Sequence, residues 1–592
     1  MDSGLSYRAE HSLVVRKWIY AKRWELVGLG VFIVLALLQT WPLVLSPLSE
    51  IPIGSEPEHT VPLLNLWVVW WNADRLASGL SGYWNAPIFY PTEGTFAFSE
   101  PQPTTWLMAP VIWITGSRIL AYNLYLWLSL VLNGVFAQRL LKEYGMTTWM
   151  ALWGGMAMVL LPIVNWQIGV IQLVPLWGIL WTWTAIERLC REPSLLRGVE
   201  LGIALGISIV TCVHHGLFLV ILLVGAAPTL WRQCLKLRNV YSWFLAVPIA
   251  LIIAGPFVFQ INKVMEKHEF EREPDLVIEQ SAKASDYFQA YGGQFIDIKP
   301  SEGSWKMLST GWIKFVLAII GVVYGLRQLD SRRWSAFLLV TAILAYLLSL
   351  GPNFHLGVWQ PWWTLVDHVP GFAQVRNVNR FAFFVQMAVV VFAAMGLYGL
   401  HQFLRGRMKR PRVQKGLPWA IGFMAFLALV EVYPTRGAMA AIPDMANQHR
   451  VWLEYVRTQT PAGHAIACFP FAPGDLVGDF QLTSEWMYLG TFHGVPMVNG
   501  YSGYFPHHYD LMREKLTKEF PSEGAFKELF RQKVKFLVLK KPTTEQAKDS
   551  NFSVSIGEYW LKRVVQDQLV DVYEVGRTKR EPPTVLEPDK VY

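Results

Sequence analysis

Two glutamates, Glu56 and Glu58, flank Pro57 in the stretch GSEPEHT. Proline disfavours the helical region for the residue before it, so we expect this stretch to be extended. Residues two apart in an extended chain point to the same side, with roughly 6–7 Å between their backbones. Two carboxylates in that arrangement could take a proton from an attacking hydroxyl, or together hold a divalent cation. The plain alternative is a pair of solvated loop charges.

Groups that could meet a phosphate occur at two other places. Arg376 and Arg380 precede a late hydrophobic span, and the paired donors of a guanidinium match phosphate geometry. The alternative is that both arginines only snorkel at a helix end. His214 and His215 lie near another span end and could hydrogen-bond a phosphate or a sugar. Neighbouring helical residues are about 100° apart, so the two histidines cannot face one cavity equally, and packing is an equally good role for either.

The segment after the first span also carries groups that suit a sugar, because aromatic faces and amides match its apolar faces and hydroxyls. The candidates are His59, Asn65, Asn85, Tyr90 and Glu100, together with Tyr501 in the Gly-rich stretch NGYSGY near the C-terminus. The last stretch could equally be an ordinary turn cluster. Trp67, Trp70 and Trp71 could instead anchor residues 61–73 at a membrane interface.

The elements that must position these residues are membrane spans. The chain of 592 residues is 53% hydrophobic and only 16% charged, whereas soluble proteins carry nearer a quarter charged residues. Its net charge of +8 comes from short basic clusters between hydrophobic runs. Such clusters are typical of cytoplasmic loops, so they exclude a nucleic-acid partner and indicate a bilayer. The four cysteines show no disulfide framework and no Cys/His metal spacing.

We predict about eleven spans, each near the length that a bilayer demands. They cover 25–46, 118–138, 147–165, 170–187, 196–213, 214–231, 240–258, 311–326, 334–350, 380–403 and 417–433. Lys and Arg precede the first span and follow every second span after it, so the N-terminus is expected in the cytoplasm and the C-terminus outside. The first span is expected to be an uncleaved anchor.

The region after the last span reads as soluble α/β structure. We predict helices at 451–459, 507–518 and 523–531 and strands at 465–471, 534–539 and 569–575. The predicted organisation is a cytoplasmic N-terminus (1–24), a transmembrane domain (25–433) with a catalytic outer loop (47–117), an extracytoplasmic α/β domain (434–576) and a tail (577–592). The fold class is thus an α-helical polytopic membrane protein with a C-terminal α/β domain.

The order of these features resembles bacterial multi-spanning glycosyltransferases of the GT-C superfamily. Three stretches carry the resemblance: LLNLWVVWW with NAPIFYPTEGTFAFSEPQP and AYNLYLWLSL, then HVPGFAQVRNVNRFAFF, then PMVNGYSGYFPHHYDLM with VKFLVL. The resemblance implies a GT-C-like fold in the bacterial inner membrane. It implies transfer of a sugar from a polyprenyl-phosphate donor to an outer glycolipid, polysaccharide or protein acceptor. It places the acidic catalytic role on Glu56 or Glu58, although the commoner pattern has Asp there.

One-step transfer needs a base for the acceptor hydroxyl and cations for the departing phosphate, and would invert the anomeric centre. Two other classes of protein stay open. A non-catalytic scaffold or partner subunit could keep the fold without the chemistry. A transporter of lipid-linked sugars usually shows inverted repeats and broken helices, and the sequence shows no internal repeat.

Overall fold

A computed structural model of the chain describes residues 23–234, 237–270, 272–296, 298, 305–408, 410–432, 437–541 and 554–578. The predicted N-terminal stretch and tail lie largely outside these ranges. Two compact units are present. Unit 1 comprises Met1–Glu56 and Glu100–Ala440, and unit 2 comprises Pro57–Ser99 and Ala441–Tyr592. Unit 2 therefore takes its chain from two distant parts of the sequence.

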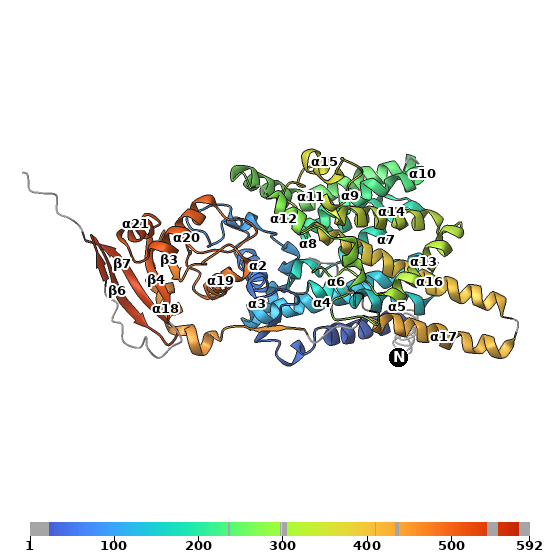
Figure 1. Ribbon diagram of the computed structural model, residues 1–592, viewed down its shortest axis with the longest axis horizontal. Helices are drawn as coiled ribbons and strands as arrows, with labels where there is room; N and C mark the ends of the chain where they lie inside the picture. Colours follow the sequence, from blue (N-terminus) through green and yellow to red (C-terminus); the bar gives the residue numbers. More distant parts are fainter. Residues whose placement is uncertain are drawn as a thin grey trace, which may run out of the picture. The chain divides into compact units, whose positions relative to one another are not determined.

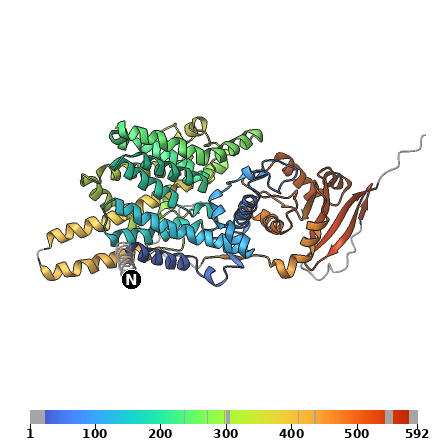
Figure 2. The same cartoon turned by 180° about the vertical axis from the view of Figure 1, so that it is seen from behind.

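Unit 1 is a bundle of helices (Figure 1). After a helix at 23–39, its α-helices are α3 (Ala109–Thr115), α4 (Arg118–Glu143), α5 (Thr148–Val159), α6 (Pro162–Trp166), α7 (Trp177–Arg191), α8 (Leu195–Thr211), α9 (Val213–Ala226), α10 (Trp231–Cys234), α11 (Leu237–Lys267), α12 (Pro274–Glu279), α13 (Trp312–Arg327), α14 (Arg332–Ser349), α15 (Pro361–His368), α16 (Ala382–Arg407) and α17 (Pro411–Val430). The last two lie side by side as a long hairpin in both views (Figures 1 and 2).

Six helices of the described chain are long and apolar enough to cross a membrane. They are Arg118–Glu143, Thr148–Trp166, Val213–Leu230, Val240–Lys267, Arg332–Ser349 and Val378–Arg407. Each coincides with a predicted span. The other five predictions also fall on helices, but α7, α8 and α13 have only 15 to 17 residues, short of the ~20 that a bilayer requires. The predicted count of eleven spans is therefore not confirmed.

Glycines allow α13 and α16 to approach closely. A Cβ built on Gly321 would lie 1.9 Å from the carbonyl oxygen of Phe392, and one built on Gly396 would lie 1.9 Å from that of Leu317. Small residues at helix crossings are the usual way for membrane helices to pack, since lipid supplies no hydrophobic drive between them. This contact fixes α16, and the segment leading into α16 carries Arg376 and Arg380.

Unit 2 is built on a five-stranded sheet in the order β3-β4-β7-β6-β5. Its strands are β3 (Ala465–Phe469), β4 (Val534–Lys540), β5 (Val554–Ile556), β6 (Tyr559–Gln566) and β7 (Val570–Arg577). Strands β3 and β4 are parallel, with Cys468 opposite Val538, and the remaining pairs are antiparallel. Helices α18 (Arg450–Gln459), α19 (Gln481–His493), α20 (His507–Glu519) and α21 (Glu523–Arg531) accompany the sheet. The predicted helices and strands of this region are confirmed; α19, β5 and β6 were not predicted.

The first loop contributes a helix to unit 2. Helix α2 (Thr60–Ala77) packs against α19. Trp67 and Trp71 stack with ring centroids 6.1 Å apart, and the exposures of Trp67, Trp70 and Trp71 are only 2%, 7% and 4%. The suggestion that these tryptophans anchor at a membrane interface is therefore wrong, because their rings are buried in the protein core.

Candidate functional site

Glu56 stands at the end of a tight turn in unit 1. Its amide donates to the carbonyl of Ile53 at 3.1 Å, and the amide of Ser55 donates to the carbonyl of Trp166 at 3.0 Å. Gly54 adopts φ +61°, a left-handed conformation that glycine takes without strain. The turn thus fixes the backbone from which the Glu56 carboxylate projects.

Arg376 and Arg380 come from the segment that leads into α16. Asn379 anchors this segment, since its side-chain amide donates to the carbonyl of Gln280 at 2.8 Å. Phe381 is fully buried and stacks on Phe218 of α9 with ring centroids 3.7 Å apart. Arg380 therefore lies between two firmly held neighbours, close to the start of α9.

The start of α9 holds a buried carboxylate. Glu100 accepts hydrogen bonds from the amides of Val213 and His214 at 3.1 and 3.2 Å, and it contacts Nδ1 of the His214 ring. Burial alone would raise the pKa of Glu100, but His214 lowers it to about 2. Glu100 is therefore ionised at neutral pH, and it fills the anion site that the helix N-terminus offers.

Glu56 belongs to the same group of charges. Burial raises the pKa of the Glu56 carboxyl above its usual 4.5, and the positive charges of Arg380 and Arg376 partly oppose that rise. Arg380 also interacts with Glu100. Glu56, Glu100, His214, Arg376 and Arg380 thus form one electrostatic cluster, which we call the unit 1 cluster. A carboxylate with a raised pKa beside two guanidinium groups can accept a proton next to a bound anion.

Two buried side chains of this region have polar atoms without a hydrogen-bond partner in the described chain. The ring of His215 is 1% exposed, with both nitrogens unpaired, and packs edge-on against Phe383. The Tyr122 hydroxyl is also unpaired, and Tyr122 interacts electrostatically with Glu56. Sequence reasoning had named His215 but not Tyr122, although Tyr122 lies in the quoted stretch AYNLYLWLSL.

Glu58 belongs to unit 2, so the two glutamates of the E-P-E stretch fall in different compact units. Its Cγ lies 3.6 Å from the position of a Cβ built on Gly478. The next residue, His59, contacts Glu485 through Nε2 at 3.0 Å and Gln481 at 3.2 Å. Burial raises the pKa of Glu485, but the hydrogen bond from His59 and the charge of Lys540 lower it overall.

The remaining sugar-binding candidates lie in unit 2 and already have partners within that unit. Asn65 is 1% exposed and donates to the carbonyl of Val61 at 3.0 Å. The side-chain oxygen of Asn85 accepts from the Gly94 amide at 2.9 Å, and the Tyr90 hydroxyl donates to the Gly463 carbonyl at 2.9 Å. Tyr501 is 6% exposed, and its ring packs 5.3 Å from that of Phe480. Their roles as sugar contacts stay predictions.

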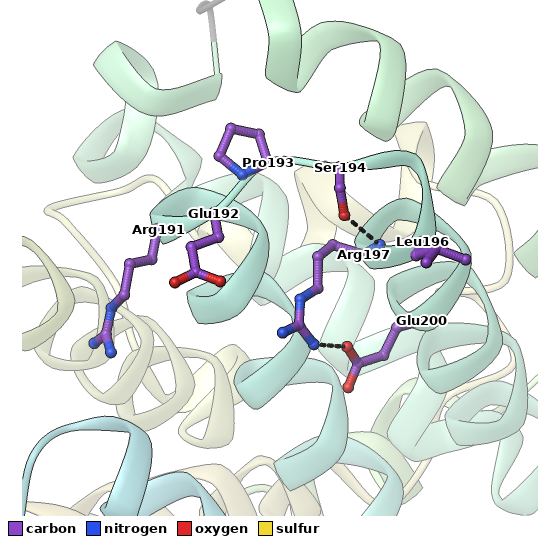
Figure 3. Close-up of a pocket in the computed structure, with 7 residues that line it drawn as sticks. All are labelled: Arg191, Glu192, Pro193, Ser194, Leu196, Arg197 and Glu200. Atoms are coloured by element: carbon purple, nitrogen blue, oxygen red, sulfur yellow. Dashed lines mark hydrogen bonds and ion pairs between the residues drawn. The ribbon is translucent and has the colours of Figure 1, made fainter.

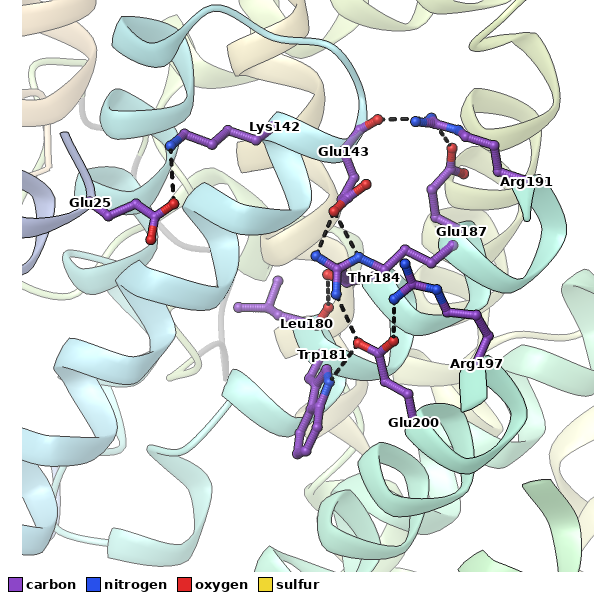
Figure 4. A network of polar contacts seen from close by, with 11 residues as sticks. Glu25, Lys142, Glu143, Leu180, Trp181, Thr184, Glu187, Arg191, Arg197 and Glu200 are labelled. Carbon is purple, nitrogen blue, oxygen red and sulfur yellow. Dashed lines mark hydrogen bonds and ion pairs between the residues drawn. The ribbon is translucent and has the colours of Figure 1, made fainter. Parts of the chain in front are cut away.

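A hollow of about 740 Å³ lies at the first turn of α8, roughly 25 Å along the helix from the unit 1 cluster. It is lined by Arg191, Glu192, Pro193, Ser194, Leu196, Arg197 and Glu200 (Figure 3). Arg197 donates to Glu200 at 2.8 Å (Figure 4). Arg188 donates to Glu200 at 2.8 Å and also to Glu143. These charges largely neutralise one another, so the hollow is a weaker candidate for the reaction than the unit 1 cluster.

Within the described ranges, no group of three or more His, Cys, Asp or Glu side chains lies close enough together to hold an ion.

The six long apolar helices place this chain among polytopic helical membrane proteins. No protein-family model and no curated protein matches the sequence. Among solved structures it is similar to the arabinofuranosyltransferase AftD from Mycobacteria, with a TM-score of 0.55 and 13% sequence identity. The likeness covers 94% of this chain and 40% of that protein. It is a likeness of fold, and it supports the GT-C-like fold that the sequence resemblance implied.

Proposed function

We propose that this chain is an inverting glycosyltransferase that moves a sugar from a polyprenyl-phosphate donor to an acceptor outside the membrane. The observation that carries the proposal is the pairing of a half-buried carboxylate, Glu56, with Arg376 and Arg380 in one cluster. The fold likeness to a glycosyltransferase supports the reaction class. A base beside an anion-binding pair of guanidinium groups is what sugar transfer from a phosphate requires.

In the proposed reaction, an acceptor hydroxyl attacks the anomeric carbon while Glu56 takes its proton. The bond between that carbon and the phosphate oxygen breaks, and the lipid phosphate leaves as an anion. Arg376 and Arg380 stabilise the charge that develops on it, so no protein acid has to protonate the leaving group. Attack from the side opposite the phosphate inverts the anomeric centre.

The raised pKa of Glu56 suits the role of base. A carboxylate of higher pKa is a stronger base, and proton transfer is most efficient when the catalytic pKa approaches the working pH. The Glu56 carboxylate interacts with both guanidinium groups of the unit 1 cluster, whereas the side chain of Glu58 lies near Gly478 in unit 2. We therefore assign the base to Glu56 and leave Glu58 outside the chemistry.

The proposed setting is the bacterial inner membrane, with the N-terminus in the cytoplasm and unit 2 outside. The basic residues between spans support this orientation. The proposed partners are the lipid-linked sugar in the bilayer and a glycan, lipid or protein acceptor. A reporter that is active only in the cytoplasm, fused after Tyr592, should stay inactive.

The matched pair Glu56→Gln and Glu58→Gln tests the assignment. Glutamine keeps the shape of the side chain and removes its basicity, so Glu56→Gln should lower turnover by about 10²-fold or more. Glu58→Gln should keep most of the activity. Full transfer by the Glu56→Gln protein would remove the proposed base, and the absence of transfer by every form would favour a non-catalytic scaffold.

A further inference from the structure

The turn that carries Glu56 is held by the last residue of α6 and by the segment that follows it. The carbonyl of Trp166 accepts from Ser55, and a Cβ built on Gly54 would lie 2.9 Å from that same oxygen. A Cβ built on Gly169 would lie 2.2 Å from the carbonyl oxygen of Ile53. Two glycines thus let the backbones touch here, and neither position has room for a side chain.

A second support comes from a side chain of the loop between α12 and α13. The hydroxyl of Tyr291 donates to the carbonyl of Gly54 at 3.1 Å. Gly54 is two residues before Glu56, and its carbonyl belongs to the peptide that leads into Ser55. The hydrogen bond therefore fixes the plane of a peptide inside the turn.

Tyr291 can act as a support because its own loop is pinned. Its neighbour Ala290 bridges to Leu308, and the amide of Ser309 donates to the carbonyl of Gln289 at 2.7 Å. The buried side chain of Gln386 in α16 donates to the carbonyl of Leu308 at 2.8 Å. The loop thus joins the Glu56 turn to the helix that follows Arg380.

A small cavity with both polar and apolar lining lies beside Tyr291. It is lined by Gln39, Leu160, Pro162, Asn165, Tyr291 and Val432 and measures about 10 Å³, the size of a single water molecule. Both amide atoms of Gln39 and the side-chain nitrogen of Asn165 lack a partner in the described chain. Unpaired amide groups thus line the same cavity as Tyr291.

We infer that Tyr291 is a positioning residue for Glu56: its hydroxyl holds the turn 53–56 so that the carboxylate faces the acceptor hydroxyl. The inference rests on the proposed function. Tyr291 touches neither the sugar nor the phosphate in this scheme. It acts on turnover, because a small misplacement of a catalytic group lowers the rate without changing how the donor is held.

Tyr291→Phe removes only the hydroxyl, and Tyr287→Phe is its matched control. Tyr287 precedes Tyr291 in the same loop. Its hydroxyl forms a hydrogen bond with the Ser349 hydroxyl at 2.7 Å and not with the Glu56 turn. Steady-state transfer by the full chain should show a roughly three- to tenfold fall in kcat for Tyr291→Phe, the effect of one hydrogen bond. The donor KM should not change. Tyr287→Phe should keep the parental kcat.

A double variant separates positioning from general loosening of the fold. In the Glu56→Gln background the base is already gone, so adding Tyr291→Phe should not lower the residual rate further. An equal fall in both backgrounds, or a Tyr291→Phe protein with parental kcat, would overturn the inference. Those outcomes leave the proposed function standing, whereas full activity of Glu56→Gln alone would remove the proposed function itself.

Discussion

The close crossing of α13 and α16 allows a prediction about stability. Alanine at Gly321 or at Gly396 would place a methyl group 1.9 Å from a carbonyl oxygen of the opposite helix. Ordinary contact begins near 3.4 Å, so the helices must separate by about 1.5 Å at this point. The clash is with backbone, which cannot rotate away as a flexible side chain can.

Overpacking of this kind costs about 1–3 kcal/mol, and each single variant should be destabilised by that amount. The two glycines face the same contact, so separation of the helices for one methyl group makes room for the other. The double variant should therefore cost less than the sum of the two single variants.

Gly422→Ala in α17 is the matched control, because a Cβ built there meets no atom within 4 Å. Alanine is the better helix former, so this change should be neutral or stabilise by up to about 1 kcal/mol. Unfolding of the purified protein in detergent, followed by the loss of helical circular dichroism, measures all four variants. Equal stability of Gly321→Ala and Gly422→Ala would refute the close crossing.

Two further predictions concern the unit 1 cluster. Because the pKa of Glu56 is raised above 4.5, transfer should be lost as the pH falls through that raised value. Removing a positive charge raises the pKa of Glu56 further. In a pH–rate profile, Arg380→Gln should therefore lose transfer at a higher pH than the parent protein does. In equilibrium binding, Arg376→Gln or Arg380→Gln should weaken affinity for the polyprenyl-phosphate sugar about ten- to a hundredfold, since a hydrogen bond to a charged group contributes roughly 1.5–3 kcal/mol. Lysine should restore only part of that affinity, and parental affinity in both Gln variants would make these arginines mere anchors. Arg118→Gln, whose guanidinium donates to the Gly116 carbonyl, serves as control and should bind normally.

Much of unit 2 could be predicted because its elements follow simple patterns. Strand β4 reads VKFLVLK, a short apolar run, and α18 repeats apolar residues at helical spacing. Helix α19 was missed because QLTSEWMYLGTFH is buried over most of its surface and lacks a polar face. Strand β6, YWLKRVVQ, is interrupted by charges where its side chains face outward.

The site was predictable residue by residue but not as an arrangement. Local rules placed Glu56 and Glu58 on one side of an extended chain, since they consider only the proline between them. The structure assigns the two residues to different units, because packing of α2 against α19 takes the chain from Pro57 onward into unit 2. A sequence pattern that spans only two residues cannot reveal such long-range packing. Nor did any local pattern single out Tyr291, whose role depends on a contact across more than two hundred residues.

The central claim is that Glu56 is the base for sugar transfer from a lipid phosphate, and that this transfer inverts the anomeric centre. The most direct measurement incubates the purified full chain with synthetic polyprenyl-phosphate sugars and a glycan acceptor, and follows both the released polyprenyl phosphate and the anomeric configuration of the product by NMR. We predict release in step with product of inverted configuration, and loss of both in the Glu56→Gln protein but not in Glu58→Gln. A product of retained configuration, or equal release by the Glu56→Gln protein, would contradict the account.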